Sequence, residues 1–189
     1  MGFYSSQSSS AKKLPNFVTQ EEFEKLFQAV IKEEKLVGIA RRKRLKAYRV
    51  AMLLGFEAGL RISEIVGWKD IPELTKDRVD INSIKILGKR NKERVVPRPK
   101  RFSNKAVEML PLKIKRRALQ RYFVGLVKKV LNREVTFHGL RHGFGSRLAG
   151  QGRPLHEIQM LMGHARLDTT GIYLHANPQK AIEGAREAF

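Results

Sequence analysis

The apolar residues of this chain recur at helical spacing along most of its length, and one stretch departs from that spacing. In residues 19–35, Phe23, Phe27 and Val30 fall on one helical face. Residues 83–97, SIKILGKRNKERVVP, instead alternate on both sides of a glycine-containing turn, which is typical of a β-hairpin. The chain is therefore predicted to be mainly α with a small antiparallel β-sheet, an α+β fold. Further helices are expected at about 41–58, 113–131, 137–149, 155–162, 168–175 and 178–187.

The charge of the chain restricts the partners that it can have. Its 189 residues include 38 Lys and Arg against 18 Asp and Glu, a formal net charge of +20. Such an excess repels itself in the folded state, so a polyanionic partner is expected, and nucleic acid is the commonest. No apolar run is long enough to span a membrane, no basic amphipathic helix suits a membrane surface, and cysteine is absent. With no secretory signal at its start, the chain is expected to be cytoplasmic.

The segment TFHGLRHG carries two histidines, His138 and His142, at the spacing of metal ligands on a helix. A metal peptidase would need a glutamate after the first histidine, where this chain has Gly139, and Arg141 would repel a cation, so no metal is expected. If Thr136 caps the helix, His138 and Arg141 share a face near its positive end, which suits a phosphate. An ordinary solvated helix fits this segment equally well.

A second histidine segment, LMGHARLDTTGIYLHA, follows about twenty residues later. A glycine before His164 lets the backbone turn and present the imidazole ring. Asp168 then caps a short predicted helix that carries Tyr173. On its own, Tyr173 is better explained as a packed aromatic residue than as a nucleophile.

Together these segments resemble the tyrosine recombinase family, the integrases and Xer-type recombinases. The motifs are GLRISEI, GKRNKERVVP, HGLR, GH and a tyrosine nine residues after that last histidine, in family order and spacing. The resemblance covers residues 15–189 and implies the integrase catalytic-domain fold, with a tail helix at about 178–187. The residues at the family's catalytic positions are Arg61, Lys89, His138, Arg141, His164 and Tyr173.

The resemblance implies a reaction and a role for each of these residues. Tyr173 would attack a DNA phosphodiester and form a 3′-phosphotyrosyl link, with no metal or other cofactor. Two arginines and His164 would hold the charge that develops on phosphorus, as an oxyanion hole does. The family assigns Lys89 as the general acid, with Lys92 as the alternative because hairpins align poorly. His138 would assist proton transfer at the tyrosine or hydrogen-bond the phosphate. From the residues alone, Arg61 would simply pair with Glu64, and the hairpin lysines would be solvated.

Basic residues outside this set are predicted to follow the DNA backbone. They concentrate in residues 41–49 and 98–121. The partner implied is double-stranded DNA with a specific recombination site, bound by a homotetramer whose subunits are monomers in solution. Residues 1–14 are interpreted as a flexible lead-in or linker stump, so the core-binding domain that precedes this domain in the family is expected to be absent. The predicted DNA contacts are Arg41, Arg42, Lys43, Arg44, Arg90, Lys92, Arg116 and Arg117.

Several functions remain open at this point. A site-specific recombinase could serve integration or excision of a mobile element, or Xer-like dimer resolution. A type IB topoisomerase shares the chemistry but relaxes DNA without choosing a site. A DNA-binding module without catalysis and an RNA-binding protein are the alternatives from other classes, and the second is suggested by charge alone.

Overall fold

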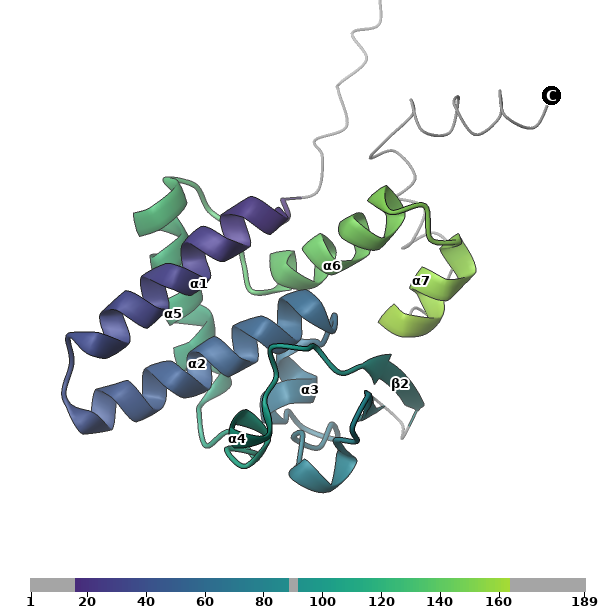
Figure 1. Ribbon diagram of the computed structural model, residues 1–189, viewed down its shortest axis with the longest axis horizontal. Helices are drawn as coiled ribbons and strands as arrows, with labels where there is room; N and C mark the ends of the chain where they lie inside the picture. Colours follow the sequence, from purple (N-terminus) through teal and green to yellow (C-terminus); the bar gives the residue numbers. More distant parts are fainter. Residues whose placement is uncertain (1–15, 89–91, 164–189) are drawn as a thin grey trace, which may run out of the picture.

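The computed structural model describes residues 16–88 and 92–163, and in these ranges the chain is mainly helical with one two-stranded antiparallel sheet (Figure 1). The predicted fold class is confirmed. The helices expected at 168–175 and 178–187, and the lead-in 1–14, lie outside the described residues. The elements are α1 (Gln20–Lys35), α2 (Ile39–Glu57), α3 (Ile62–Val66), the 3-10 turn η1 (Lys76–Arg78), β1 (Ser83–Leu87), β2 (Glu93–Pro97), α4 (Asn104–Val107), α5 (Arg116–Leu131), α6 (His138–Gly150) and α7 (Leu155–Met162).

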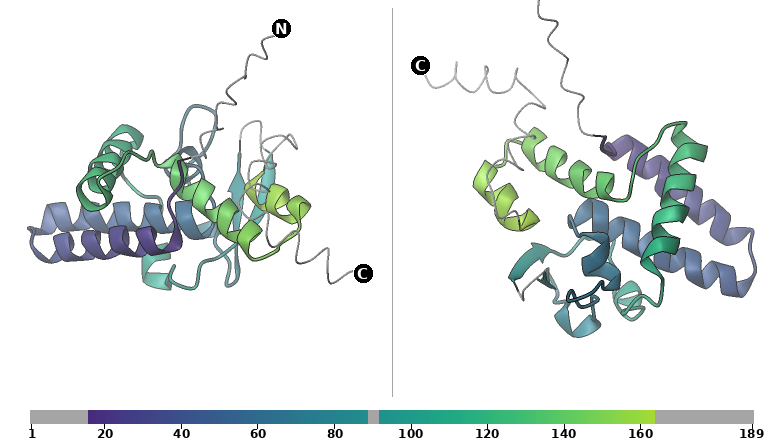
Figure 2. Two further views of the ribbon diagram at one scale, coloured as in Figure 1. Left: turned by 90° about the horizontal axis from the view of Figure 1, so that it is seen from above. Right: turned by 180° about the vertical axis from the view of Figure 1, so that it is seen from behind.

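Helices α1 and α2 form an antiparallel pair that α5 and α6 cover (Figures 1 and 2). Helix α1 begins where predicted, because Thr19 and Glu22 form a reciprocal capping box. Its apolar face packs on the second half of α2, and the rings of Phe23 and Phe56 stack with their centroids 4.1 Å apart. The hairpin and α7 lie at the end of the molecule away from the α1–α2 turn.

The first half of α2 carries a run of exposed basic residues at the α1–α2 turn. Cations at a helix N-terminus oppose the helix dipole, so these side chains need acceptors elsewhere. The end of α1 supplies them: Arg42 donates to the carbonyl oxygens of Glu34 and Val37, and Arg41 donates to Glu33 at 2.7 Å. The first two arginines of the basic run are therefore hydrogen-bonded to the C-terminal end of α1.

The predicted hairpin is confirmed, with β1 and β2 antiparallel and Leu87 opposite Glu93. The pairs Ile84–Val96 and Ile86–Arg94 lie on one face of the sheet, since partners across an antiparallel pair share a face. Three of these four side chains are buried apolar residues and the fourth is an arginine. This face of the hairpin is the one that meets the rest of the domain, including α7.

Helix α6 approaches its neighbours closely along a strip of glycines. A Cβ atom on Gly143 would lie 2.2 Å from the carbonyl oxygen of Val18, and one on Gly139 would lie 2.2 Å from the Val135 side chain. Thr136 does not cap this helix with its side chain. Residue 137 is already in the helical region, the helix begins one residue later, and Thr136 uses its backbone carbonyl to accept from the Gly139 amide at 2.8 Å. No helix in residues 16–88 and 92–163 is long and apolar enough to cross a bilayer.

Candidate active site

Arg61 occupies the junction between α2 and α3, as the residue that precedes the first turn of α3. Its backbone amide and its Nη1 atom both donate to the carboxylate of Glu64, at 2.8 and 2.9 Å. Its Nη2 atom reaches the carbonyl oxygen of Gly163 at 3.3 Å. The pairing expected from the residues alone is therefore present, yet 34% of the Arg61 side chain stays exposed. The guanidinium is held at one edge and open at the other.

Arg141 differs from the expectation that it shares with His138 a helix face suited to a phosphate. The residue is 1% exposed, and Nη1 donates to the carbonyl oxygen of Gly59 at 2.5 Å while Nη2 donates to that of Met162. A buried guanidinium requires such acceptors. The reason is the close packing of α6, which turns this position into the interior. Arg141 thus joins the end of α2 to the end of α7.

His138 lies at the start of α6 and is exposed, so it does not share a surface with the buried Arg141. Its ring meets that of His142 edge to face, with centroids 4.5 Å apart. Partial burial of the ring, together with the charges of His142, Arg141 and Arg61, lowers the pKa of His138 to about 4. The pKa of His142 is lowered too, by burial and by Arg141. A neutral imidazole is therefore expected at neutral pH.

His138 and Arg61, at the starts of α6 and α3, line one cavity of about 310 Å³. Ser63, Gln120 and Thr136 contribute to its lining. On the other side of Arg61, a cleft of about 990 Å³ runs between the hairpin and α7, and Lys92 lies on its wall. Both hollows share Arg61, which places this side chain between an imidazole and a lysine.

A metal peptidase would need a glutamate at the position of Gly139, and the packing around this residue leaves no room for one. Its missing Cβ would already contact Val135, and the carbonyl oxygen of Asn16 would lie 3.0 Å away, so a glutamate does not fit there without movement. Among the described residues, no group of three or more His, Cys, Asp or Glu side chains could hold a metal ion.

The pairing of Glu64 with Arg61 was anticipated in the sequence, but the contact of Glu64 with Arg94 was missed. Glu64 accepts from both terminal nitrogens of Arg94, at 2.7 and 2.8 Å, in addition to its bonds with Arg61. Burial alone would raise the pKa of Glu64, but the hydrogen bonds and charge of Arg94, with those of Arg61, lower it to about 2. The alternation of the hairpin could have found Arg94, because it stands opposite the inward-facing Ile86.

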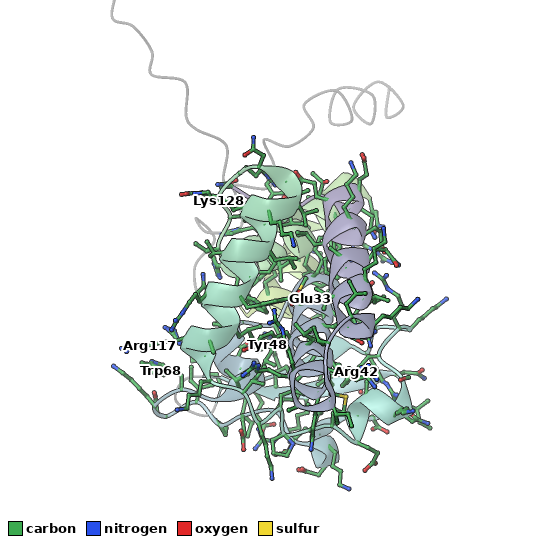
Figure 3. All side chains as sticks on the ribbon, turned by 90° about the vertical axis from the view of Figure 1, so that its left-hand side faces the viewer. Glu33, Arg42, Tyr48, Trp68, Arg117 and Lys128 are labelled. Carbon is green, nitrogen blue, oxygen red and sulfur yellow. The ribbon has the colours of Figure 1, made fainter. Side chains whose placement is uncertain are left out.

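Arg116, at the start of α5, packs against the ring of Trp68. The Arg116 guanidinium sits 4.5 Å from the centre of the Trp68 ring, which is 43% exposed. The ring is held by a tight turn in which Trp68 and Ile71 exchange backbone hydrogen bonds at 2.9 and 3.0 Å. Figure 3 shows Trp68 and Arg117 projecting on the same side of the molecule, with Lys128 at the opposite end of α5. Arg116 is one helical turn from Gln120, which lines the cavity beside His138.

Comparison with known proteins identifies the family of the chain. The sequence model of the phage integrase family matches residues 111–180. The tyrosine recombinase XerC of Staphylococcus epidermidis is 32% identical over 191 residues, which cover 89% of this chain and 60% of that protein. The XerC of Staphylococcus haemolyticus is 33% identical over 189 residues, with 88% and 59% covered. The chain belongs to the tyrosine recombinase family. It spans about 60% of the length of these relatives.

Solved recombinase structures have the same fold. A XerH recombinase bound to its palindromic difH substrate, in a post-cleavage complex, superposes with a TM-score of 0.63 at 26% identity, over 95% of this chain and 55% of that one. The catalytic domain of bacteriophage HP1 integrase gives a TM-score of 0.63 at 19% identity, over 90% and 93%. At that identity, the second similarity concerns the fold alone.

The recombinase family's residue positions divide into two groups in this structure. Arg61, His138 and Arg141 lie within the described residues and meet around the junction of α2, α6 and α7. Lys89, His164 and Tyr173 lie outside them, as does Arg90 of the predicted DNA contacts. Lys92, the alternative to Lys89, is exposed on the wall of the cleft that Arg61 also lines. The remaining predicted DNA contacts are Arg41, Arg42, Lys43 and Arg44, exposed at the start of α2, and Arg116 and Arg117 at the start of α5.

Proposed function

We propose that this chain is the catalytic domain of a site-specific DNA recombinase, which cleaves and rejoins double-stranded DNA through Tyr173. Its biological role would be integration or excision of a mobile element, or Xer-like dimer resolution. The relatives that it matches are named tyrosine recombinases, and the XerH structure holds a difH DNA substrate after cleavage. Since the chain spans only part of those relatives, the activity of the whole protein is carried over as a proposal.

One observation supports this proposal most strongly. Arg61 and Arg141 come from elements far apart in the sequence, and both donate hydrogen bonds to the last backbone carbonyls before His164. The acceptors are those of Gly163 and Met162 respectively. Two cations are thereby gathered next to the position that the family gives to a third phosphate ligand. An arginine pair at a phosphoryl site supplies donors for the oxygens on which charge develops.

In the proposed reaction, the Tyr173 oxygen bonds to phosphorus and the bond from phosphorus to the 5′ oxygen breaks. The phenolic proton passes to His138 or to water, and Lys89 donates a proton to the departing 5′ oxygen. A phenol leaves more readily than an alcohol, so the reverse step that rejoins the strand stays accessible. The lowered pKa of His138 supports its part, because a neutral imidazole can accept a proton.

Arg141 must change a partner to take part in this reaction. Both of its terminal nitrogens face backbone carbonyl oxygens, so a phosphate oxygen would replace one of these acceptors. Arg61 needs less change, because a third of its side chain is already exposed. We therefore assign Arg61 to first contact with the scissile phosphate, and Arg141 to a contact made as the site closes on it.

The DNA would approach across the side of the molecule that carries the start of α5. Arg116 and Arg117 stand there beside the exposed Trp68, close to the cavity that Arg61 and His138 line. Stacking on Trp68 limits the freedom of Arg116 before DNA arrives, which lowers the entropy lost on binding. On the recombination site we expect a homotetramer of subunits that are monomers in solution, with the tail at 178–187 contributing to assembly, in the cytoplasm.

A covalent selection tests this function. The protein is incubated with nicked duplexes whose central segment is randomised, and the DNA that stays attached after denaturation is sequenced. A site-specific recombinase should recover duplexes that share a sequence. Covalent recovery of unrelated sequences would indicate a relaxing enzyme without site choice, and no covalent DNA from any library would exclude cleavage by this chain.

A further inference from the structure

Glu64 is a buried carboxylate shared by two arginines of unequal mobility. Only 1% of its side chain is exposed. Oε1 accepts from Nη1 of Arg61 at 2.9 Å and from Nη1 of Arg94 at 2.7 Å, and Oε2 accepts from the Arg61 amide and from Nη2 of Arg94, each at 2.8 Å. Both carboxylate oxygens are thus bound by Arg61, at the start of α3, and by Arg94 of β2.

Arg94 is the fixed member of the pair. Its side chain is 9% exposed, grips Glu64 with two parallel bonds, and places Nε 2.9 Å from the carbonyl oxygen of Leu161 on α7. Such bidentate arginine–carboxylate pairs are the strong ones. Arg61 makes one side-chain bond to Glu64 and a long one to Gly163, and is 34% exposed. Arg61 is therefore the member that can leave.

Departure of Arg61 toward a phosphate would be difficult if it were the sole counter-ion of Glu64. Removing one partner of a buried ion pair leaves an uncompensated charge and is strongly unfavourable. Arg94 removes this difficulty, because its two bonds to Glu64 remain when the Arg61 side chain turns away. The bond from Glu64 to the Arg61 amide also remains, so the start of α3 keeps its position.

We propose that Arg94 is a positioning residue that serves as the standing counter-ion of Glu64, which frees the Arg61 side chain to bind the scissile phosphate. The proposal rests on the proposed function, in which Arg61 is a phosphate ligand. The alternative is a purely structural role, in which Arg94 links the hairpin to α7 through its bond to Leu161. When Glu64 is neutralised in the absence of Arg94, the proposal predicts that cleavage recovers, whereas the structural role predicts that it does not.

The cleavage test compares Arg94→Met with the double variant Glu64→Gln/Arg94→Met. In Arg94→Met, Glu64 retains Arg61, so the single-turnover rate of adduct formation at saturating nicked duplex should fall about tenfold or more, short of the loss expected for Arg61→Ala. The affinity for duplex should change little. In the double variant, a neutral amide no longer holds Arg61, so the rate should recover by several-fold. A double variant as slow as Arg94→Met would overturn the proposal.

Two further variants control for misfolding. Arg133→Met removes a guanidinium with a similar set of bonds, to Glu22 and to the carbonyl oxygen of Phe17, away from the cleft. It should cleave at the wild-type rate once its fold is confirmed by circular dichroism. Arg94→Lys keeps a positive charge beside Glu64 but cannot reproduce three bonds. Its rate of adduct formation should lie between those of wild type and Arg94→Met. Equal loss of rate in both Arg94 variants would contradict the proposal and favour the purely structural link between the hairpin and α7.

The pH dependence of the same rate adds a readout that a structural tie would not alter. In Arg94→Met, protonation of Glu64 also releases Arg61. The ratio of the variant's rate of adduct formation to the wild-type rate should therefore rise as the pH is lowered. The charged and titratable groups that line the cleft with Glu64 are Arg61, Lys92, Glu93, Arg94 and His156. His138 and Arg141 are the corresponding groups on the α6 side, where His138 interacts with Arg61. Comparison with wild type cancels the groups that titrate in both proteins. An unchanged pH profile would contradict the proposal.

A spectroscopic titration separates this proposal from the proposed function. The ¹³C carboxyl signal of Glu64 is followed by NMR, with and without duplex DNA, in wild type and Arg94→Met. In wild type, Glu64 should stay charged at neutral pH with DNA bound; in Arg94→Met, DNA should raise its pKa. Protonation of wild-type Glu64 on DNA binding would overturn the role of Arg94, whether or not any adduct forms. Failure of wild type to form adducts, with this titration as expected, would count against the proposed function alone.

Discussion

At the scale of single residues, the protonation of His138 decides what this side chain can do. Its pKa, lowered to about 4, keeps the imidazole neutral at neutral pH and able to accept a proton from a phenol. The cations around it, Arg141 and Arg61, would also hold a phosphate. A bound phosphate adds negative charge, so DNA binding should raise the pKa of His138 again.

We predict that NMR titration of the free protein gives His138 a pKa near 4, with no change of its ring signals around neutral pH. Because this pKa lies below the ordinary value of 6.5, the unfolded chain binds more protons as the pH falls from 6.5 to about 4. The free energy of unfolding should therefore decrease across that window, and less so in His138→Gln. A pKa at or above 6.5 in the free protein would contradict the geometry described for the α6 start.

Trp68 is the single tryptophan of the chain, and it reports directly on the surface proposed to bind DNA. Addition of duplex DNA should change its fluorescence, and salt should reverse the change. Arg116→Ala should weaken binding and reduce the salt slope by about 1. Lys128→Ala, at the other end of α5, should leave the fluorescence change intact. Unaltered emission at saturating DNA would place the duplex on another face.

At the scale of elements, α6 is positioned by its glycines. A methyl group on Gly143 would meet the carbonyl oxygen of Val18 at 2.2 Å and the Phe56 ring at 2.8 Å, whereas one on Gly125 of α5 meets nothing within 4 Å. Gly143→Ala should therefore destabilise the domain by about 1–3 kcal/mol, as overpacking does. Gly125→Ala should be neutral or stabilise it by up to about 1 kcal/mol. Chemical denaturation measures both, and equal effects would show that α6 does not pack as described.

How far the sequence could predict these elements depended on the range of the interactions involved. The start of α1 and the hairpin depend on residues a few positions apart, so capping and alternation found them. The side chain of Thr136 does not cap α6 because residue 137 is already in the helical region, and Thr136 accepts from the Gly139 amide with its backbone carbonyl instead. The burial of Arg141 was not predicted because its acceptors, at Gly59 and Met162, lie 82 and 21 residues away. Arg94 was within reach of the pairing rule but was not recognised.

At the scale of the whole molecule, the chain has a net charge of +20, and two of its basic regions are proposed to have different roles. The basic start of α2 lies about 24 Å along the helix from its end near Arg61. Neutralising Arg41, Lys43 and Arg44 should weaken DNA binding and flatten its salt dependence by about 3 in slope. The rate of cleavage at saturating DNA should be nearly unchanged in that variant.

Arg61→Ala should give the opposite result. Loss of a charge-stabilising donor should slow cleavage by about a hundredfold or more while binding weakens little. Filter binding across a range of salt concentrations, with single-turnover cleavage, measures both quantities for both variants. Equal loss of binding and cleavage in each variant would show that the two regions are not divided in this way.

Mapping of the covalent link tests the central claim most directly. The protein is incubated with a selected nicked duplex in excess EDTA, the adduct is denatured and digested, and the peptide that carries the nucleotide is identified by mass spectrometry. The account predicts a 3′-phosphate on Tyr173, an undiminished yield in EDTA, and no adduct from Tyr173→Phe. An adduct that survives this substitution, or one that requires a divalent metal ion, would contradict it.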